Sequence, residues 1–180
     1  MTKVLYVRHG QTFSNVKKVL SDSQDNTPLT DLGKEQAKQA GQELKGMNID
    51  RIICSPKDRA YDTAKIIAEQ IGFDINDIRK DDRITEYNTG ESAGLPIEGM
   101  TAERLVGGRG AEDPQKFASR VRETLKEISK YDGTTLIVGH GGTAKMIDCL
   151  TTGVDPAKFF SISKKPNAHA FELDLSWLDS

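Results

Sequence analysis

Long apolar runs are missing from this chain of 180 residues, of which 36% are hydrophobic and 29% are charged. The mean hydropathy is −0.52, and runs such as residues 4–7 are far shorter than the roughly 20 residues that cross a bilayer. The sequence therefore predicts no membrane span. Only residues 1–3 precede that first run, too few for a charged leader and an apolar signal segment, so we expect a cytoplasmic location.

An excess of charge of one sign is also missing. The chain has 25 basic and 27 acidic residues, which gives a formal net charge of −2. Such a balance produces no broad positive field that could hold nucleic acid or an anionic membrane. We therefore expect neither as a partner, and any basic site must be local.

Cysteine is scarce. Cys54 and Cys149 lack the C-x-x-C spacing, and together with histidines 9, 140 and 169 they form no metal-ligand pattern. We expect two small buried thiols in a reducing compartment. No metal or other cofactor is expected.

Short apolar runs alternate with amphipathic helical stretches, which is typical of βαβ units and a mostly parallel sheet. Strands are predicted at residues 3–7, 49–54 and 134–138, with a weak strand near 78–80 and a late edge strand over 171–175. Helices are predicted at residues 30–44, 56–72, 114–133 and 142–150. No repeat, linker or low-complexity tract divides the chain, so we predict an α/β fold in a single domain over residues 1–180.

Several boundaries rest on capping residues. Ser55-Pro56 and Asp113-Pro114 each have the form of a cap followed by proline at the first helical position, and Gly133 is expected to end the later helix. Residues 87–110 contain glycines at 90, 94, 99, 107, 108 and 110. We expect a mobile, mostly irregular excursion there.

Polar groups follow three of the predicted strands. Arg8 and His9 end the first strand, His140 ends the strand near 134–138, and Arg59 lies in the first helical turn after the strand near 49–54. Ligands of open α/β sheets sit outside the carboxyl ends of the strands. The sequence therefore places these groups at one edge of the sheet.

Five motifs along the chain have a common resemblance. They are Arg8-His9-Gly10-Gln11-Thr12 with Asn15; Pro28-Leu29-Thr30 with Gly33 and Gln36-Ala37; Ser55-Pro56 with Arg59-Ala60 and Thr63-Ala64; Arg83 and Glu86 with Gly90; and Val138-Gly139-His140-Gly141. In their type and order the chain resembles the histidine phosphatase superfamily, the phosphoglycerate mutase-like proteins, over nearly its whole length. The resemblance implies a three-layer α/β/α sandwich.

The chemistry of phosphate transfer fits these residues. A phosphate ester gathers negative charge on its oxygens during attack, so its site needs positioned cations and hydrogen-bond donors. Arg8 and Arg59 each present a planar fork of donors, and the helix beginning beyond Gly141 adds backbone N–H groups. Asn15 would add a neutral donor to the phosphate.

The catalytic roles follow from the same resemblance. His9 is the expected nucleophile, attacking phosphorus to give a phosphohistidine intermediate. His140 would stabilise the developing charge. Glu86, similar in position to the family's acidic residue, would protonate the departing oxygen and then take a proton from water.

Other interpretations compete with these roles. Glu86 lies in an acid-rich run, and any of three neighbours could be the proton donor instead: Asp81, Asp82 and Glu91. Asn15 could cap a turn, and Arg59 could pair with an acid on its own helix. His169 is interpreted as structural. The pair Lys164-Lys165 is expected to be solvated, although a neighbouring site could use it to attract an anionic substrate.

Hydrolases and mutases of the family share the first half-reaction, which leaves two activities open. The family's mutases are longer, with a more elaborate segment before the second histidine and a tail that shields the intermediate. This shorter chain favours water as acceptor, hence a phosphatase for small-molecule phosphomonoesters rather than phosphoproteins. The alternatives are mutase-type transfer, a non-catalytic module that binds phosphorylated ligands and, with least support, a metal-dependent hydrolase.

Overall fold

A central sheet organises the computed structural model, which describes residues 2–179. Within these residues the strands are β1 (Thr2–Arg8), β2 (Arg51–Cys54), β3 (Arg79–Lys80), β4 (Gly133–Gly139) and β5 (Ala170–Glu172), in the order β3-β2-β4-β1-β5. The first four pair in parallel, and β5 joins β1 antiparallel at the edge. The predicted mostly parallel sheet with a late edge strand is confirmed.

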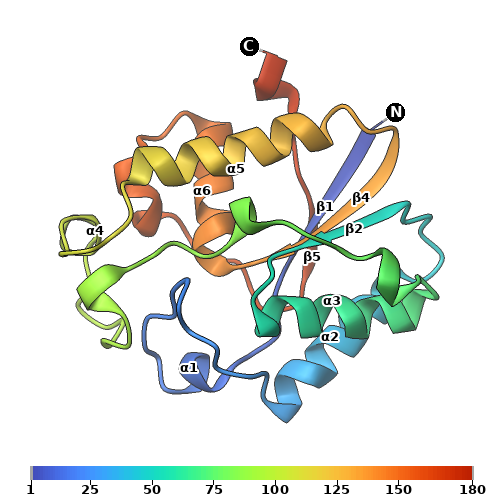
Figure 1. Cartoon of the computed structure of the whole chain (residues 1–180), viewed down its shortest axis with the longest axis horizontal. Coiled ribbons are helices and arrows are strands. Elements are labelled where there is room, and N and C mark those ends of the chain that lie inside the picture. The colour runs from blue at the N-terminus through green and yellow to red at the C-terminus, as the bar shows by residue number, and fades with distance from the viewer. Residues whose placement is uncertain (1, 180) are drawn as a thin grey trace.

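Helices cover both faces of this sheet (Figure 1). The described helices are α1 (Phe13–Val16), α2 (Asp31–Leu44), α3 (Asp58–Ile71), α4 (Ala102–Val106), α5 (Pro114–Ile128) and α6 (Gly141–Thr152). Helices α2 and α3 lie on one face, and α5 and α6 lie on the other, which gives the predicted three-layer α/β/α sandwich. In the part of the chain that is described, no helix has the length and apolar character to cross a bilayer.

Strand β1 shows why both faces are covered. Val4 and Tyr6 pack in the cluster of α5 and α6, whereas Leu5 and Val7 pack in the cluster of α2 and α3. Successive side chains of a strand point to opposite faces, so a run that is apolar at every position needs helices on both sides. The free cysteines, Cys54 and Cys149, are buried one in each cluster, as the sequence predicted.

Two predicted helix boundaries are wrong. Helix α3 begins at Asp58 and not at Pro56, because the Ser55 amide still donates to the Val138 carbonyl at 3.0 Å and prolongs the sheet ladder. Helix α5 ends at Ile128 and not at Gly133. Gly133, with a φ of 89°, instead opens β4, where an added Cβ would lie 2.2 Å from the Asp50 carboxylate.

The glycine-rich segment is mostly irregular, as predicted, with only α4 and the short 3₁₀ helix η3 (Gly90–Ser92) between residues 87 and 110. It pairs with an earlier loop through backbone hydrogen bonds. The Leu20 amide donates to the Leu95 carbonyl at 2.9 Å, and the Ile97 amide donates to the Lys18 carbonyl at 2.9 Å. Two loops distant in sequence therefore lie side by side.

Candidate active site

The carboxyl ends of β1 and β4 bring the two predicted imidazoles together. Arg8 and Gly139 are partners in register, and the next amide, that of His9, donates to the Gly139 carbonyl at 2.9 Å. The residues that follow each strand are thus neighbours. The ring centroids of His9 and His140 are 5.4 Å apart, with an interplanar angle of 63°.

His9 is held in one tautomer. Its Nδ1 lies 2.7 Å from the Gly10 carbonyl, which can only accept, so Nδ1 carries the proton and Nε2 is unprotonated in the neutral ring. Burial, and then the cations Arg8 and Arg59, lower the pKa of His9 well below its ordinary value. The imidazole is therefore neutral around pH 7, as a nitrogen nucleophile must be.

Arg8 and Arg59 are both almost fully buried, but their guanidinium groups donate to carbonyl oxygens. Arg8 Nη1 donates to the Lys165 carbonyl at 3.0 Å, and Arg59 donates to the carbonyls of Asp22, at 3.0 Å, and Asp25. The Nε atoms of both arginines have no partner. Within residues 2–179 neither arginine forms an ion pair, so the competing interpretation of Arg59 as a surface ion-pair partner is not what the structure shows.

His140 is completely buried, and neither ring nitrogen has a hydrogen-bond partner. Its backbone is held by Tyr6, whose hydroxyl donates to the His140 carbonyl and accepts from the His140 amide, each at 2.8 Å. Burial, followed by the charges of Arg59, His9 and Arg8, lowers the pKa of His140. Sequence reasoning missed Tyr6, because it stands in an apolar strand and looked like ordinary core.

Glu86 is the acid that reaches this cluster. Its carboxylate accepts from the Tyr87 amide and from the Gly142 amide at the start of α6, each at 2.9 Å. The competing acids are turned elsewhere: Asp81 is paired with arginines, Asp82 is exposed, and Glu91 accepts from the Arg109 amide. An added Cβ on Gly142 would lie 2.2 Å from a Glu86 oxygen, so a side chain at this position would displace the carboxylate.

Arg120, on α5, holds the segment that carries Glu86. Its guanidinium donates to the carbonyls of Arg83 and Thr85, at 2.7 and 2.6 Å, and its Nε donates to the Glu112 carboxylate at 2.7 Å. Sequence reasoning missed this contact, because Arg120 is 34 residues from Glu86 in the chain. Helix α5 thus holds in place the segment that carries Glu86.

Asn15 has the capping role offered for it and also lies at the cavity. It completes the capping box of α1, and its side chain also lines the cavity beside His9. Its Oδ1 accepts from the Thr12 amide at 3.1 Å and from Asn167 Nδ2 at 3.3 Å, which leaves its own Nδ2 as a donor. Asn167 also donates to the His9 carbonyl at 2.7 Å and was missed, since it lies in an irregular late loop.

A cavity of about 110 Å³ opens over these residues. Arg8, His9, Asn15, Glu86 and Gly141 all line it, whereas Arg59 and His140 are buried and are not among its lining residues. In the described part of the chain, no three His, Cys, Asp or Glu side chains are placed to share a metal ion. His169 is exposed just before β5 and is not among the residues that line the cavity.

A family model shows which protein family this chain belongs to. The model of the histidine phosphatase superfamily (branch 1) matches residues 4–176. The chain belongs to this superfamily. The resemblance of its five motifs is thereby confirmed.

Curated members of the superfamily include both enzyme types. The 2,3-bisphosphoglycerate-dependent phosphoglycerate mutase of Thermoplasma acidophilum is 34% identical over 78% of this chain and 71% of its own length. Phosphoserine phosphatase 1 of Hydrogenobacter thermophilus is 30% identical over 89% of this chain and 81% of its own. Such relatives confirm the prediction of a histidine phosphatase-type enzyme.

A solved structure supports the fold independently. The mycobacterial glucosyl-3-phosphoglycerate phosphatase, described as a complex with VO3, superposes with a TM-score of 0.79 at 25% identity. The alignment covers 94% of this chain and 91% of that one. The α/β sandwich is therefore the fold of a histidine phosphatase.

Proposed function

We propose that this chain is a metal-independent phosphomonoesterase that acts on small phosphorylated metabolites through a phosphohistidine intermediate. The observation that carries the proposal is the neutral His9, whose unprotonated Nε2 lies in a buried cluster with two guanidinium groups that form no ion pair with a carboxylate of the described residues. The family match over residues 4–176 supports a single domain over residues 1–180. A cytoplasmic location stays a prediction that cell fractionation would test.

In the first half-reaction, His9 Nε2 attacks phosphorus, and the bond from phosphorus to the ester oxygen breaks as the N–P bond forms. Arg8 and Arg59 bind the phosphoryl oxygens, and the amides at the start of α6, beginning with Gly141, add donors at a helix N-terminus. His140 donates to the same oxygens as their charge grows. A proton moves from the Glu86 carboxyl group to the departing alkoxide.

In the second half-reaction, water attacks phosphorus and the N–P bond breaks. Glu86, now a carboxylate, takes one proton from that water, which restores its acid form and releases inorganic phosphate. The hydrogen bonds from Tyr87 and Gly142 each use one lone pair of Glu86, so each oxygen keeps another for the proton. Asn15 Nδ2 remains available to a phosphoryl oxygen.

A mutase is the second candidate, because one curated relative is a phosphoglycerate mutase at 34% identity. The two activities differ only in what accepts the phosphoryl group from His9. The segment between Glu86 and His140 contains only α4 and α5 as α-helices in the described residues. We infer that so little covering structure leaves the phosphoryl group on His9 open to water, which favours hydrolysis.

Hydrolysis of p-nitrophenyl phosphate in excess chelator tests the proposal. We expect turnover that persists without divalent metal, is inhibited by vanadate, and falls at least about 10⁴-fold in His9→Ala, because the nucleophile is lost. Denaturing the wild-type protein during turnover should trap phosphate on His9 by an alkali-stable, acid-labile bond, detected by mass spectrometry. Activity that dies with chelator and returns with a divalent ion would reject the mechanism.

His9→Asn serves as a control, since it keeps a polar side chain at a buried position and its thermal unfolding shows whether the fold persists. An isomerisation assay on 3-phosphoglycerate with bisphosphate primer separates the two candidates. Isomerisation faster than phosphate release would favour the mutase. Phosphate binding without any turnover would instead identify a non-catalytic module.

A further inference from the structure

Beyond Arg8 and His9, the cavity becomes apolar. This outer part is formed by the two paired loops, by α4 and by the 3₁₀ helix η4 (Pro156–Ser161). Its apolar lining residues are Val19, Leu20, Tyr87, Ile97, Leu105, Phe159 and Phe160. Whatever the phosphate is esterified to must therefore contact mostly hydrocarbon.

Two lysines interrupt this apolar lining. Lys145, on α6, donates to the Phe160 carbonyl at 2.7 Å and lies 4.6 Å from the Phe160 ring centroid, which leaves two of its three N–H donors unused. Lys164 lines the same cavity. Within residues 2–179 neither lysine forms an ion pair, although the neighbouring Lys165 pairs with Asp148 at 3.1 Å.

Both ammonium groups are electrostatically unfavourable in the free protein. The pKa of Lys145 is lowered, and that of Lys164 is lowered to about 8, by burial first and then by nearby cations that include Arg8. Glu86 is the only acidic side chain among the described residues that line the cavity. One carboxylate therefore faces three lining cations, Arg8 and the two lysines.

In the proposed mechanism, a phosphoryl group at His9 already has two guanidinium groups and the N-terminus of α6 as its partners. A phosphate attacked by His9 must lie against Arg8, at the inner end of the cavity, where the helix N-terminus also faces it. The lysines would then have no anion of their own. The arrangement calls for a second negative group on the same small molecule.

We propose that this pocket selects phosphomonoesters that carry a second anionic group, a carboxylate or a second phosphate, bound by Lys145 and Lys164. The apolar lining contacts the short carbon chain between the two anions. The inference rests on the proposed function, and it gives the exposed Lys164 the role of attracting an anionic substrate, which the sequence had left open for the Lys164-Lys165 pair.

Matched substrate pairs test the inference. The first pair is 3-phosphoglycerate and glycerol 3-phosphate, which differ by a carboxylate, and the second is propane-1,3-diol bisphosphate and propyl phosphate. We expect kcat/KM to favour the doubly anionic member of at least one pair about tenfold or more, the range of a charge-assisted hydrogen bond. The two pairs distinguish carboxylate from phosphate recognition.

Charge-removing variants assign the preference to the lysines. Lys145→Met and Lys164→Met keep the length of the side chain but remove the ammonium group, and each should bring the ratio within the preferred pair down by about threefold to tenfold. The ratio is the informative quantity, because a loss shared by both substrates cancels. Lys158→Met removes an exposed lysine of η4 outside the cavity lining and should leave the ratio unchanged. Lys164→Arg keeps the positive charge and should keep the wild-type ratio that Lys164→Met loses.

The possible failures are distinguishable. Turnover of p-nitrophenyl phosphate with ratios near one in both pairs would overturn the second-anion site and leave the proposed function intact. The second-anion site would also be overturned if both methionine variants kept the substrate preference of the wild-type protein. Absence of any phosphate release from all of these compounds would contradict the proposed function itself.

Discussion

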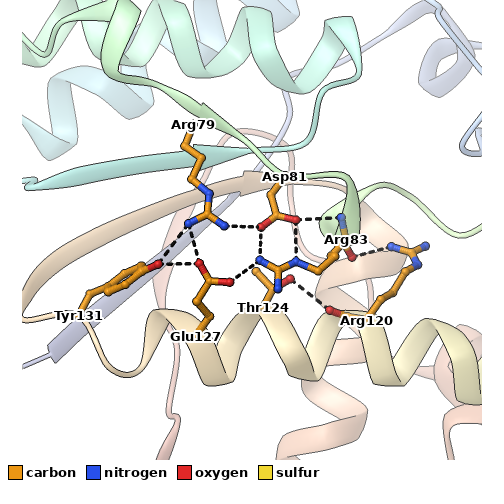
Figure 2. Close-up of polar contacts among 7 residues, drawn as sticks. All are labelled: Arg79, Asp81, Arg83, Arg120, Thr124, Glu127 and Tyr131. Carbon is orange, nitrogen blue, oxygen red and sulfur yellow. Dashed lines mark hydrogen bonds and ion pairs between the residues drawn. The ribbon is translucent and has the colours of Figure 1, made fainter.

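Two clusters of charged side chains in this protein use arginine in opposite ways. In the first, Arg79 and Arg83 alternate with Asp81 and Glu127 between β3, the 3₁₀ helix η2 (Asp82–Ile84) and α5 (Figure 2). Arg83 lies 2.6 Å from both carboxylates, and Arg79 lies 2.7 Å from Glu127 and 3.2 Å from Asp81. Every charge has a partner of opposite sign.

The second cluster, around His9, is deeper and lacks that pairing. Arg8 and Arg59 are 4% and 1% exposed, against 43% and 32% for the side chains of Arg79 and Arg83. Burial lowers the pKa of Arg8 and of Arg59, whereas Asp81 and Glu127 raise the pKa of Arg83. The guanidinium groups near His9 are thus poorly compensated by the protein itself.

The difference separates charge that stabilises the fold from charge that is suited to a ligand. Paired, half-exposed charges contribute modestly to stability and have no capacity left for another anion. Buried cations without carboxylates are costly in the free protein, and an anion that enters recovers part of that free energy. Substitutions in the two clusters should consequently affect different measurements.

The largest expected difference between the two clusters is in the catalytic activity of their variants. Arg59→Met should lower kcat/KM for p-nitrophenyl phosphate about 10²- to 10³-fold, the range for losing one donor to a developing oxyanion. Arg79→Met, the matched substitution in the paired cluster, should leave kcat/KM within about twofold and lower the free energy of unfolding by about 1 kcal/mol or less. Equal losses of activity in the two variants would contradict this division of roles.

Anions should have a smaller effect on stability, confined to the buried cluster. Phosphate or vanadate at about 100 times its Kd should stabilise the wild-type protein by about 2.7 kcal/mol, measured as a rise in Tm. Arg59→Met should lose most of that rise, while Arg79→Met should keep it. A similar rise with sodium chloride at equal ionic strength would show that the effect is not specific to phosphate-like anions.

The smallest effect concerns the paired cluster and pH. Hydrogen bonds from Arg79, Tyr131 and Arg83 lower the pKa of Glu127 from 4.5 to about 2. The folded carboxylate therefore adds stability above pH 4.5, and this contribution is lost as the pH falls toward 2. In urea unfolding, Glu127→Gln should cost about 0.5–1 kcal/mol at pH 7, and the difference from wild type should shrink steadily below pH 4. A difference that is constant with pH would exclude the ion pairs as its source.

The sequence predicted those features that depend on neighbours in the chain. The strands near residues 3–7 and 134–138 and the Asp113 cap of α5 are local patterns, and the structure has them. The order of strands then placed the histidine-bearing ends side by side. The glycine-rich segment was also correctly expected to be mostly irregular.

Features that depend on tertiary contacts could not be predicted in this way. The start of α3 shifted because the Ser55 amide prefers a partner in β4 to a helical position. Arg120, Asn167 and Tyr6 support the site from elements far along the chain, and nothing in their local sequence indicates it. Lys145 and Lys164, proposed to bind the second anion, likewise come together only because the surrounding loops enclose the cavity.

The nucleophile's loop comes into main-chain contact with α2. A Cβ on Gly10 would lie 2.3 Å from the Gly33 carbonyl oxygen, and one on Gly33 would lie 2.1 Å from the Gln11 carbonyl oxygen. No repacking of side chains can relieve such a collision, so neither glycine can be replaced by a larger residue when the site is redesigned. Redesign for bulkier substrates should begin across the cavity, at Ile97 and Leu105, where the boundary consists of exchangeable side chains.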